Sequence, residues 1–530
     1  MSKIQMLDCT LRDGGYCNSW RFGVGNIKGI IQKLTNANID IIECGYLKYF
    51  AKKDVDRTIY PSLCDVEAVV SEVKSINRNT QYACMINYGE YPIEYLPEYT
   101  GGYVNCIRCA FHKKDLQEAV EYCKSVIDKG YEVYVQPMVV SDYSQAEIQD
   151  LVNKVNQIKP TGVYIVDSFG VMDGTDLTEL VLEINSNLNP EILLGFHSHN
   201  NLQLSYSNAK TFIRLAENRD TLLDATVFGM GRGAGNLNIE LFAHYLNKEK
   251  NANYRIDKMM ATYDEHISAF YNKKMWGYSL ATYLSATYNC HPNYASYLNE
   301  KDTLTINDME NLFSMLDINK KNHFDREYIE DIYQKYLAKN QSMQINDEII
   351  ESLLANPVLI IASGQSSYKE KERILKYIAE FSPIVVSIND NYKFYEPDIV
   401  FVTNKKRARK LQCGNSKLVI TSNIKNILAD MVIDYGQFIN HYTTVADNAV
   451  LMLFSYLISI GKKEVFLAGL DGYSHDIYNN YAREEMILCP QPEILDKKNE
   501  EINAYIYSVR ESLKVHFITT EKFIGGNDKV

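Results

Sequence analysis

Short apolar runs recur through the first 240 residues or so of the chain, separated by longer stretches of mixed polarity. Each run has the length of a β-strand and is bounded by polar or glycine-containing segments. The eight predicted strands are IQMLDCTL (4–11), IDIIECGY (39–46), YACMINY (82–88), VNCIRCAF (104–111), YEVYVQPMVV (131–140), GVYIVDSF (162–169), ILLGFHSH (192–199) and LLDATVFGM (222–230).

Between these strands, apolar residues recur at spacings of three and four, which predicts helices with one buried face. Ile27, Ile30, Ile31 and Leu34 are one such series. Eight strand–helix units in this length match the size of a (β/α)8 barrel. A doubly wound open sheet is the alternative, but the first turn, RDGGYCN, lacks the G-x-G-x-x-G phosphate fingerprint. We therefore predict a TIM barrel over residues 1–250.

The rest of the chain shows two further patterns. Residues 251–352 are helix-like and rich in Tyr and Asn, which predicts a helical extension. Within it, DINKKNHFDREY (317–328) begins like an EF-hand loop, but Asn322 replaces the required glycine and Tyr328 the bidentate Glu, so we reject a calcium site. Alternating strands and helices then predict a doubly wound, Rossmann-like α/β domain over residues 353–530.

Polar and ionisable residues gather where the predicted barrel strands end. Barrel enzymes place their reacting groups at this carboxyl-terminal face, so these residues are the candidates for chemistry. They are Arg12, Asp13, Glu43, Tyr46, Asn87, Arg108, His112, Gln136, Asp167, Ser168, His197, His199 and Asn236. Gln136 is expected to be structural. Packing alone does not explain why so many other polar and ionisable residues gather at one end of the barrel.

The segment FHSHNN (196–201) places His197 and His199 on one face of a strand, with their Cα atoms about 6.5–7 Å apart. Both imidazoles can therefore reach one ion, and Asp13 from the first strand would add a carboxylate. Two histidines and one carboxylate leave positions open for water and substrate, as a catalytic site requires. Nitrogen and oxygen ligands suit Mn²⁺, Mg²⁺, Co²⁺ or Zn²⁺. Non-haem iron oxygenases use the same ligand set, so that reaction class stays open.

Net charge, apolar runs and cysteine content bear on the partners of the protein and on its cellular compartment. The formal net charge of −12, without an offsetting basic stripe, argues against a nucleic-acid partner. The first residues reach Asp8 too soon for a signal-peptide core, and no apolar run approaches the roughly 20 residues that cross a bilayer. Eleven cysteines without framework spacing are typical of reduced thiols, so we expect a cytoplasmic protein with no membrane span.

Three motifs together carry a family resemblance: LDCTLRDGG (7–15), FHSHNN (196–201) and GMGRGAGN (229–236). In this order and spacing they resemble the DRE-TIM metallolyase superfamily, the HMG-CoA lyase-like enzymes. The resemblance covers roughly the first 240 residues. It implies a divalent metal, with Mn²⁺ first among the four. The ligands that it implies are Asp13, His197 and His199, with Asn236 beside the metal.

The same resemblance assigns roles to other residues at the strand ends. Arg12 would polarise the carbonyl that becomes an enolate, and Glu43 would orient Arg12. The loop GMGRGAGN lacks the cysteine of HMG-CoA lyase, and VYIVDSFG is similar to 4-hydroxy-2-oxovalerate aldolases, where the serine helps to hold pyruvate's carboxylate. We carry that role to Ser168, and give Arg108 and Asn87 substrate-binding roles.

The general base is where the sequence departs from those aldolases. They carry a histidine three residues after the metal aspartate, and here that residue is Tyr16. Either Tyr16 takes this role or another group does, and His112 is the alternative. The predicted reaction makes or cleaves a carbon–carbon bond next to a 2-oxo acid, and negative charge then develops on the ketone oxygen beside the metal and Arg12.

The last domain shows a weaker resemblance. NAVLMLFSYLISIGKKEVFLAGLDGYS (448–474) resembles bacterial glycan-assembly proteins of the motor-accessory-factor and sialyltransferase-like families. The resemblance implies a nucleotide-activated sugar near Gly364 and Asp471. A purely structural or oligomerising domain is the alternative. Together with the chemistry expected of the barrel, the glycan-assembly resemblance suggests an aldehyde or sugar electrophile in surface-polysaccharide biosynthesis.

Other functions stay open at this point. The barrel could use an acyl-CoA as the carbon nucleophile, as the Claisen synthases of the superfamily do, or it could be a non-catalytic scaffold for the last domain. The intact set of Arg12, Asp13, His197 and His199 argues against a scaffold. We expect small-molecule substrates and a homo-oligomer.

Overall fold

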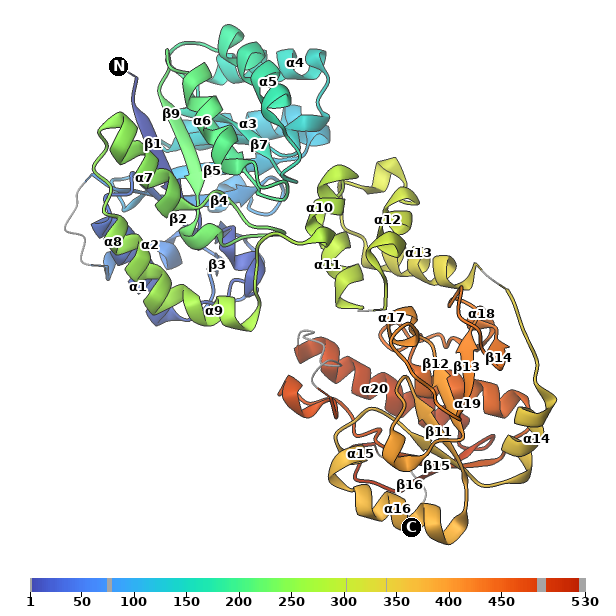
Figure 1. Cartoon of the computed structure of the whole chain (residues 1–530). Helices are drawn as coiled ribbons and strands as arrows, with labels where there is room; N and C mark the ends of the chain where they lie inside the picture. Colours follow the sequence, from blue (N-terminus) through green and yellow to red (C-terminus); the bar gives the residue numbers. More distant parts are fainter. Residues whose placement is uncertain (1, 74–78, 302, 340, 484–491, 524–530) are drawn as a thin grey trace. The chain divides into compact units, whose positions relative to one another are not determined.

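The computed structural model describes residues 2–73, 79–301, 303–339, 341–483 and 492–523. The chain divides into two compact units (Figure 1). The first unit contains residues 1–296 and a short returning segment, Lys321–Phe324. The second contains Tyr297–Lys320 and all that follows residue 324. The predicted helical extension is therefore shared between the two units.

The first unit is built on an eight-stranded parallel barrel, as the sequence predicted. Its strands are β1 (Ile4–Asp8), β2 (Ile41–Leu47), β4 (Gln81–Asn87), β5 (Val104–Phe111), β6 (Glu132–Pro137), β7 (Gly162–Asp167), β8 (Leu193–Ser198) and β9 (Thr221–Ala225). The barrel closes because β1 pairs with both β2 and β9. The sequence did not predict β3 (Ile59–Tyr60), a two-residue strand that pairs with the end of β2.

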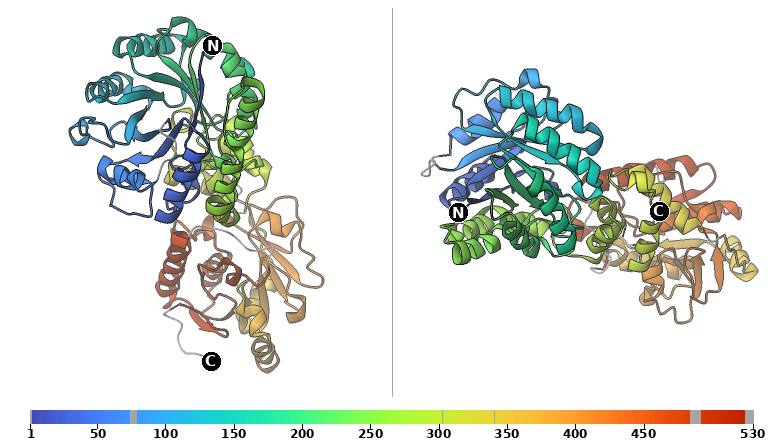
Figure 2. Two further views of the ribbon diagram at one scale, coloured as in Figure 1. Left: turned by 90° about the vertical axis from the view of Figure 1, so that its left-hand side faces the viewer. Right: turned by 90° about the horizontal axis from the view of Figure 1, so that it is seen from above.

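Helices cover the outside of this barrel (Figure 2). They are α1 (Val24–Asn36), α2 (Leu63–Ser71), α3 (Leu116–Asp128), α4 (Gln145–Ile158), α5 (Gly174–Asn187), α6 (Ser205–Leu215) and α7 (Ile239–Lys250). The larger apolar core lies between these helices and the outward face of the strands. Strand residues such as Leu7, Ala83, Tyr164 and Leu222 form a separate inner core. Packing therefore fills the barrel interior, and the strand ends remain for polar groups.

The helical extension follows α7. It consists of α8 (Ile256–Thr262), a π-helical turn (Tyr263–Ile267), α9 (Ser268–Lys273), α10 (Leu280–Thr287), α11 (Pro292–Glu300), α12 (Ile306–Ser314), α13 (Arg326–Ala338) and α14 (Asp347–Ala355). One acidic side chain ties it to the barrel. Asp142, in the loop after β6, accepts hydrogen bonds from Asn289 at 2.9 Å and from Asn322 at 2.5 Å.

The second unit contains a parallel α/β sheet. Its strands are β10 (Val358–Ile361), β11 (Ile384–Ile388), β12 (Ile399–Val402), β13 (Lys417–Thr421), β14 (Met431–Ile433), β15 (Glu464–Ala468) and β16 (Lys514–Phe517). Their order is β14-β13-β12-β11-β10-β15-β16. Six of them were predicted from apolar runs in the sequence, and the three-residue β14 was not. These runs are VLIIAS, IVVSIN, DIVFVT, KLVITS, EVFLAG and VHFITT. The order reverses between β10 and β15, which is the switch point of a doubly wound sheet.

The helices of this unit are α15 (Ser366–Lys369), α16 (Lys371–Phe381), α17 (Lys405–Ala408), α18 (Tyr435–Phe438), α19 (Ala449–Ser459) and α20 (Pro492–Val509). Most residues of α19 are buried. In the part of the chain that the structure describes, no helix is both long and apolar enough to cross a membrane.

A glycine in β2 allows a bulge beside the site. The register of β2 against β4 shifts between Glu43 and Tyr46, and Gly45 lies inside this shift with φ +143°. A Cβ on Gly45 would lie 2.2 Å from the carbonyl oxygen of Thr58. Bulges of this kind redirect side chains next to active sites.

Gly45→Ala is expected to lower the free energy of unfolding of the barrel by more than about 2 kcal/mol, since it adds both a clash and backbone strain. Gly25→Ala is the matched control, because Gly25 is exposed in α1 and a Cβ there meets open space. The Gly25→Ala change should raise the free energy of unfolding by about 0.5–1 kcal/mol. Both tryptophans, Trp20 and Trp276, lie in the barrel unit, so urea unfolding followed by tryptophan fluorescence measures this unit. Equal stability of the two variants would contradict the role given to Gly45.

Candidate metal centre

Three buried side chains converge at the carboxyl-terminal mouth of the barrel. Asp13 follows β1, while His197 is the last residue but one of β8 and His199 comes directly after that strand. One ligand atom from each lies within 4.8 Å of the others. Asp13 is 1% exposed, and each histidine 4%. Strand periodicity explains the pair, because alternate residues project from the same face.

The glycine-rich loop after β9 folds over this cluster. Asn236 donates a hydrogen bond from Nδ2 to Oδ2 of Asp13 at 2.5 Å and a second to the Met230 carbonyl at 3.1 Å. Glycine at position 231 leaves room for the first of these bonds, since a Cβ there would lie 2.1 Å from Nδ2 of Asn236 and 2.8 Å from Oδ2 of Asp13. Asn201, the last residue of FHSHNN, holds the loop by accepting from the Ala234 amide at 2.7 Å. The three sequence motifs therefore meet at one place.

These residues fit a divalent cation. Nδ1 of His199 and Oδ1 of Asn236 are buried and have no hydrogen-bond partner among the described residues. Burial lowers the pKa of His199 to about 3, which leaves the neutral imidazole that binds metals. Burial alone would raise the pKa of Asp13, but His199, which is protonated only at the low pH where Asp13 titrates, and the Arg12 guanidinium hold it well below its usual range. Asp13 therefore carries the negative charge that would favour a divalent cation.

A second trio of potential ligands is less suited to a metal. Cys9, His197 and Asp224 also lie close enough together to bind one ion. Burial, however, raises the pKa of the Cys9 thiol well above its usual range, and the protonated thiol is a poor ligand. Nδ1 of His197 is also taken, since it lies 2.9 Å from Oδ2 of Asp224. This contact leaves Nε2 of His197 for an ion at the Asp13 site.

Behind the Asp13, His197 and His199 cluster, charged side chains form a continuous chain of hydrogen bonds. Arg12 donates to Asp13 at 2.7 Å and to Glu43 at 2.8 Å. Arg108 donates to the same Glu43 oxygen at 2.8 Å and also to Asp224. The sequence identified Arg12, Glu43 and Arg108, but Asp224 was missed. The sequence did carry a signal for Asp224: it lies two residues after Leu222 in a strand that ends at the mouth, so both side chains share one face.

A cavity opens above the metal ligands, within the barrel unit. Of the other predicted site residues, Arg12, Tyr16, Asn87, His112 and Ser168 line it. Glu43 and Arg108 lie below it, and both are 0% exposed. The substrate-binding role given to Arg108 from the sequence therefore becomes a positioning role in our proposal. Gln136, which was expected to be structural, also lines the cavity.

A second wall of this cavity lies outside the strand ends; from its sequence, HPNY (291–294) could line the mouth, form a dimer contact or belong to an aromatic core, and the structure places His291 at the mouth. His291 and Arg232 line it, and Lys321–Phe324, the segment that returns from the extension, contributes His323. The rings of His112 and His323 are 4.4 Å apart between centroids. Burial and the charge of Arg232 lower the pKa of His291 to about 2. No barrel periodicity marks these residues, and His323 lies inside the segment rejected as an EF-hand.

Comparisons with known proteins agree with this geometry. Residues 104–265 match the family model described as HMGL-like. A 4-hydroxy-2-oxovalerate aldolase from Geobacillus genomosp. 3 is 25% identical over 245 residues, which are 46% of this chain and 71% of that protein. The barrel is an HMGL-like domain related to the 4-hydroxy-2-oxovalerate aldolases.

Two further matches cover the HMGL-like domain. An oxaloacetate decarboxylase from Mycobacterium tuberculosis is 25% identical over 244 residues, covering 46% of this chain and 70% of that protein. A crystal structure of the N-terminal domain of a candidate aldolase from Bacteroides vulgatus is 28% identical, with a TM-score of 0.50. The match covers 57% of this chain and 98% of that domain. These matches concern the barrel and leave the identity of the C-terminal domain open.

Asp224→Asn is expected to weaken Mn²⁺ binding by about 10–100-fold, because it removes the carboxylate that fixes the His197 ring. Mn²⁺ binding can be followed by the loss of the free-ion signal in electron paramagnetic resonance. Glu179→Gln is the control of equal charge change, since Glu179 is exposed on α5. Unchanged Mn²⁺ affinity in the folded Asp224→Asn variant would contradict the positioning role.

Proposed function

We propose that the barrel is a divalent-metal-dependent carbon–carbon lyase, an aldolase that makes or cleaves the bond next to a 2-oxo acid. One observation carries the proposal: the Asp13, His197 and His199 cluster lies beside Arg12 at the floor of one cavity. The relationship to 4-hydroxy-2-oxovalerate aldolases supports the reaction class.

The residues at the floor suit a reaction in which charge develops on a ketone oxygen. A bound divalent cation would act as a Lewis acid toward the oxygens of the 2-oxo acid, and Mn²⁺ is the metal that we propose. The Arg12 guanidinium is held by Asp13 and Glu43, and its remaining nitrogen has no partner among the described residues. Arg12 would donate to the ketone oxygen as that oxygen becomes negative, which favours the transition state over the substrate.

Ser168 and Arg232 are placed to hold the substrate carboxylate. Oγ of Ser168 accepts from the Val139 amide at 2.9 Å, so its own hydrogen is available to donate. Arg232 donates to the Ser168 carbonyl at 3.2 Å, and it has no carboxylate partner among the described residues. The pair therefore combines a hydroxyl donor and a positive charge at one side of the cavity.

We propose Tyr16 as the base that removes the proton of the 4-hydroxyl group, with His112 as the alternative. Tyr16 belongs to the turn Gly14–Cys17, directly after the metal ligand Asp13, and lines the cavity. The Arg232 guanidinium lies 5.0 Å from the centre of its ring. His112 is the competitor because burial and neighbouring His323 lower its pKa, which keeps it neutral and able to accept a proton.

The electrophile that we propose is an aldehyde, including sugar-derived aldehydes of surface-polysaccharide biosynthesis. The matched oxaloacetate decarboxylase indicates a second reaction, loss of carbon dioxide from a 2-oxo diacid. Both reactions leave the same pyruvate enolate, so one test addresses them together. An acyl-CoA nucleophile would place the enolate on a thioester instead.

The enzyme with Mn²⁺ is expected to exchange the methyl protons of pyruvate for deuterium. Samples quenched with EDTA can be followed by proton NMR. His197→Ala should lower the exchange rate at least about 100-fold, because it removes a metal ligand. His244→Ala is the matched control, since His244 is exposed on α7. Exchange into acetyl-CoA but not pyruvate would favour the Claisen reaction, and exchange into neither would contradict the proposed function.

Tyr16→Phe is expected to lower kcat for cleavage of 4-hydroxy-2-oxopentanoate by about 100-fold or more, because the phenol is the proposed proton acceptor. Its Mn²⁺ affinity should stay unchanged, since Tyr16 is not a ligand. Pyruvate release can be coupled to lactate dehydrogenase. His112→Gln provides the comparison: full activity in Tyr16→Phe together with loss in His112→Gln would identify His112 as the base instead.

A further inference from the structure

A second cavity lies wholly within the C-terminal unit, at the carboxyl-terminal ends of its strands. The loops that follow β10, β11, β12 and β15 all contribute to its lining, as does the start of α19. The cavity therefore opens where the strand order reverses, between β10 and β15. In open α/β sheets this switch point is where ligands bind, because the loops on its two sides run in opposite directions.

Two glycines let the loops at the switch point approach each other. The amide of Gly364 donates to the Gly469 carbonyl at 2.7 Å, and a Cβ on Gly364 would lie 2.5 Å from that oxygen. Gly469 has φ +77°. Asp471 accepts from the Ser366 amide at 2.7 Å and from its hydroxyl, so its carboxylate is occupied in holding this turn. Gly364 and Asp471, predicted from the sequence, thus form the base of the cavity.

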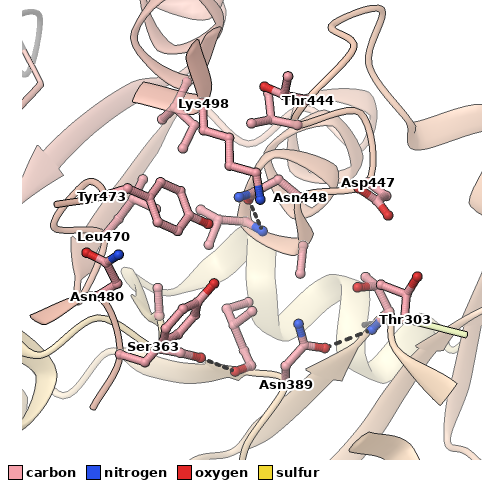
Figure 3. A pocket seen from close by; sticks show the side chains of 18 of the residues that line it. Thr303, Ser363, Asn389, Thr444, Asp447, Asn448, Leu470, Tyr473, Asn480 and Lys498 are labelled. Atoms are coloured by element: carbon pink, nitrogen blue, oxygen red, sulfur yellow. Dashed lines mark hydrogen bonds between the residues drawn. The ribbon is translucent and has the colours of Figure 1, made fainter. Parts of the chain in front are cut away.

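The charges around the cavity favour an anion. Its described lining contains four basic residues and three acidic ones, although the whole chain has a net charge of −12. Lys498 on α20 and Arg407 on α17 have no ion-pair partner among the described residues. In Figure 3 the Lys498 side chain extends toward Asn448, the N-cap of α19. The α19 N-terminus adds positive potential at the same wall.

Hydrogen-bond donors without partners face the same space. Thr403 is 8% exposed, and its hydroxyl has no hydrogen-bond partner in the described part of the chain. The Asn389 oxygen accepts from the Thr403 amide at 3.1 Å, so its Nδ2 group remains free and points into the cavity in Figure 3. Thr403 is buried and Asn389 half-buried, and both line the cavity, so a polar ligand there could accept hydrogen bonds from them.

We propose that this cavity binds a phosphorylated small molecule, with its phosphate held by Lys498 and Arg407 beside the positive end of α19, whose first amides Asn448 caps. Thr403 and Asn389 would donate to the hydroxyl-bearing part of the ligand. A phosphate suits the site because it carries several acceptor oxygens and negative charge, which the two unpaired cations and the helix end match. The site belongs to the second unit alone, so the proposal does not rest on the reaction proposed for the barrel.

The test is isothermal titration calorimetry of the full chain in EDTA, with inorganic pyrophosphate, ribose 5-phosphate and the four common nucleoside diphosphates as probes. At least one probe is expected to bind saturably, and Lys498→Gln and Arg407→Gln should each weaken it at least tenfold. Lys497→Gln and Arg409→Gln are the matched controls on the same two segments, since both residues are exposed and lie outside the described lining. The affinity of these two variants for the probe should stay within twofold of that of the natural chain.

The remaining outcomes show which part of the ligand is recognised and which of the two cavities binds it. A nucleoside diphosphate that binds tighter than pyrophosphate would identify a nucleotide, as the sequence resemblance implied, and equal binding would identify the phosphate group alone. The His197→Ala variant must bind the probe as tightly as the natural chain does. Weaker binding by this variant would place the probe in the barrel. No saturable binding by any probe, or equal weakening by the control variants, would overturn the proposal.

Discussion

The barrel mouth depends on the pairing of charges that are almost completely removed from water. Unpaired, each would cost several kcal/mol to bury, so each must meet a partner of opposite sign. The chain of partners runs in the order Asp13, Arg12, Glu43, Arg108, Asp224 and His197. Because it begins and ends at a proposed metal ligand, the position of one is tied to that of the other through side chains from five strands or strand ends. Loss of any member leaves its neighbours with one partner fewer in a place that water hardly reaches.

This constraint accounts for local features that otherwise have little in common. The bulge at Gly45 lies two residues beyond Glu43, where β2 must present a carboxylate inward and then continue into pairing with β3. The tight loop at Gly231 brings the Asn236 amide to the carboxylate oxygen of Asp13 that faces away from Arg12. The polar groups thus determine where the backbone departs from regular barrel geometry, while apolar packing determines the rest.

Much of this could be predicted from the sequence, because the signals are local. Eight strand patterns and the alternation within FHSHNN predicted the barrel and paired His197 with His199. Three kinds of feature were not accessible. The two- and three-residue strands β3 and β14 are too short to show a period. The depth of Arg108 depends on barrel closure, and the approach of His291 and His323 depends on tertiary contacts that local periodicity does not encode.

The barrel unit is discontinuous along the chain, since it ends at Ser296 and then takes back Lys321–Phe324. That short return supplies one wall of the cavity above the metal ligands. A break in the gene before the return would therefore leave this wall open, while a break just after it would keep the wall together with residues 297–320 of the other unit. A transferable barrel module therefore has to extend past its last strand and helices, as far as residue 324.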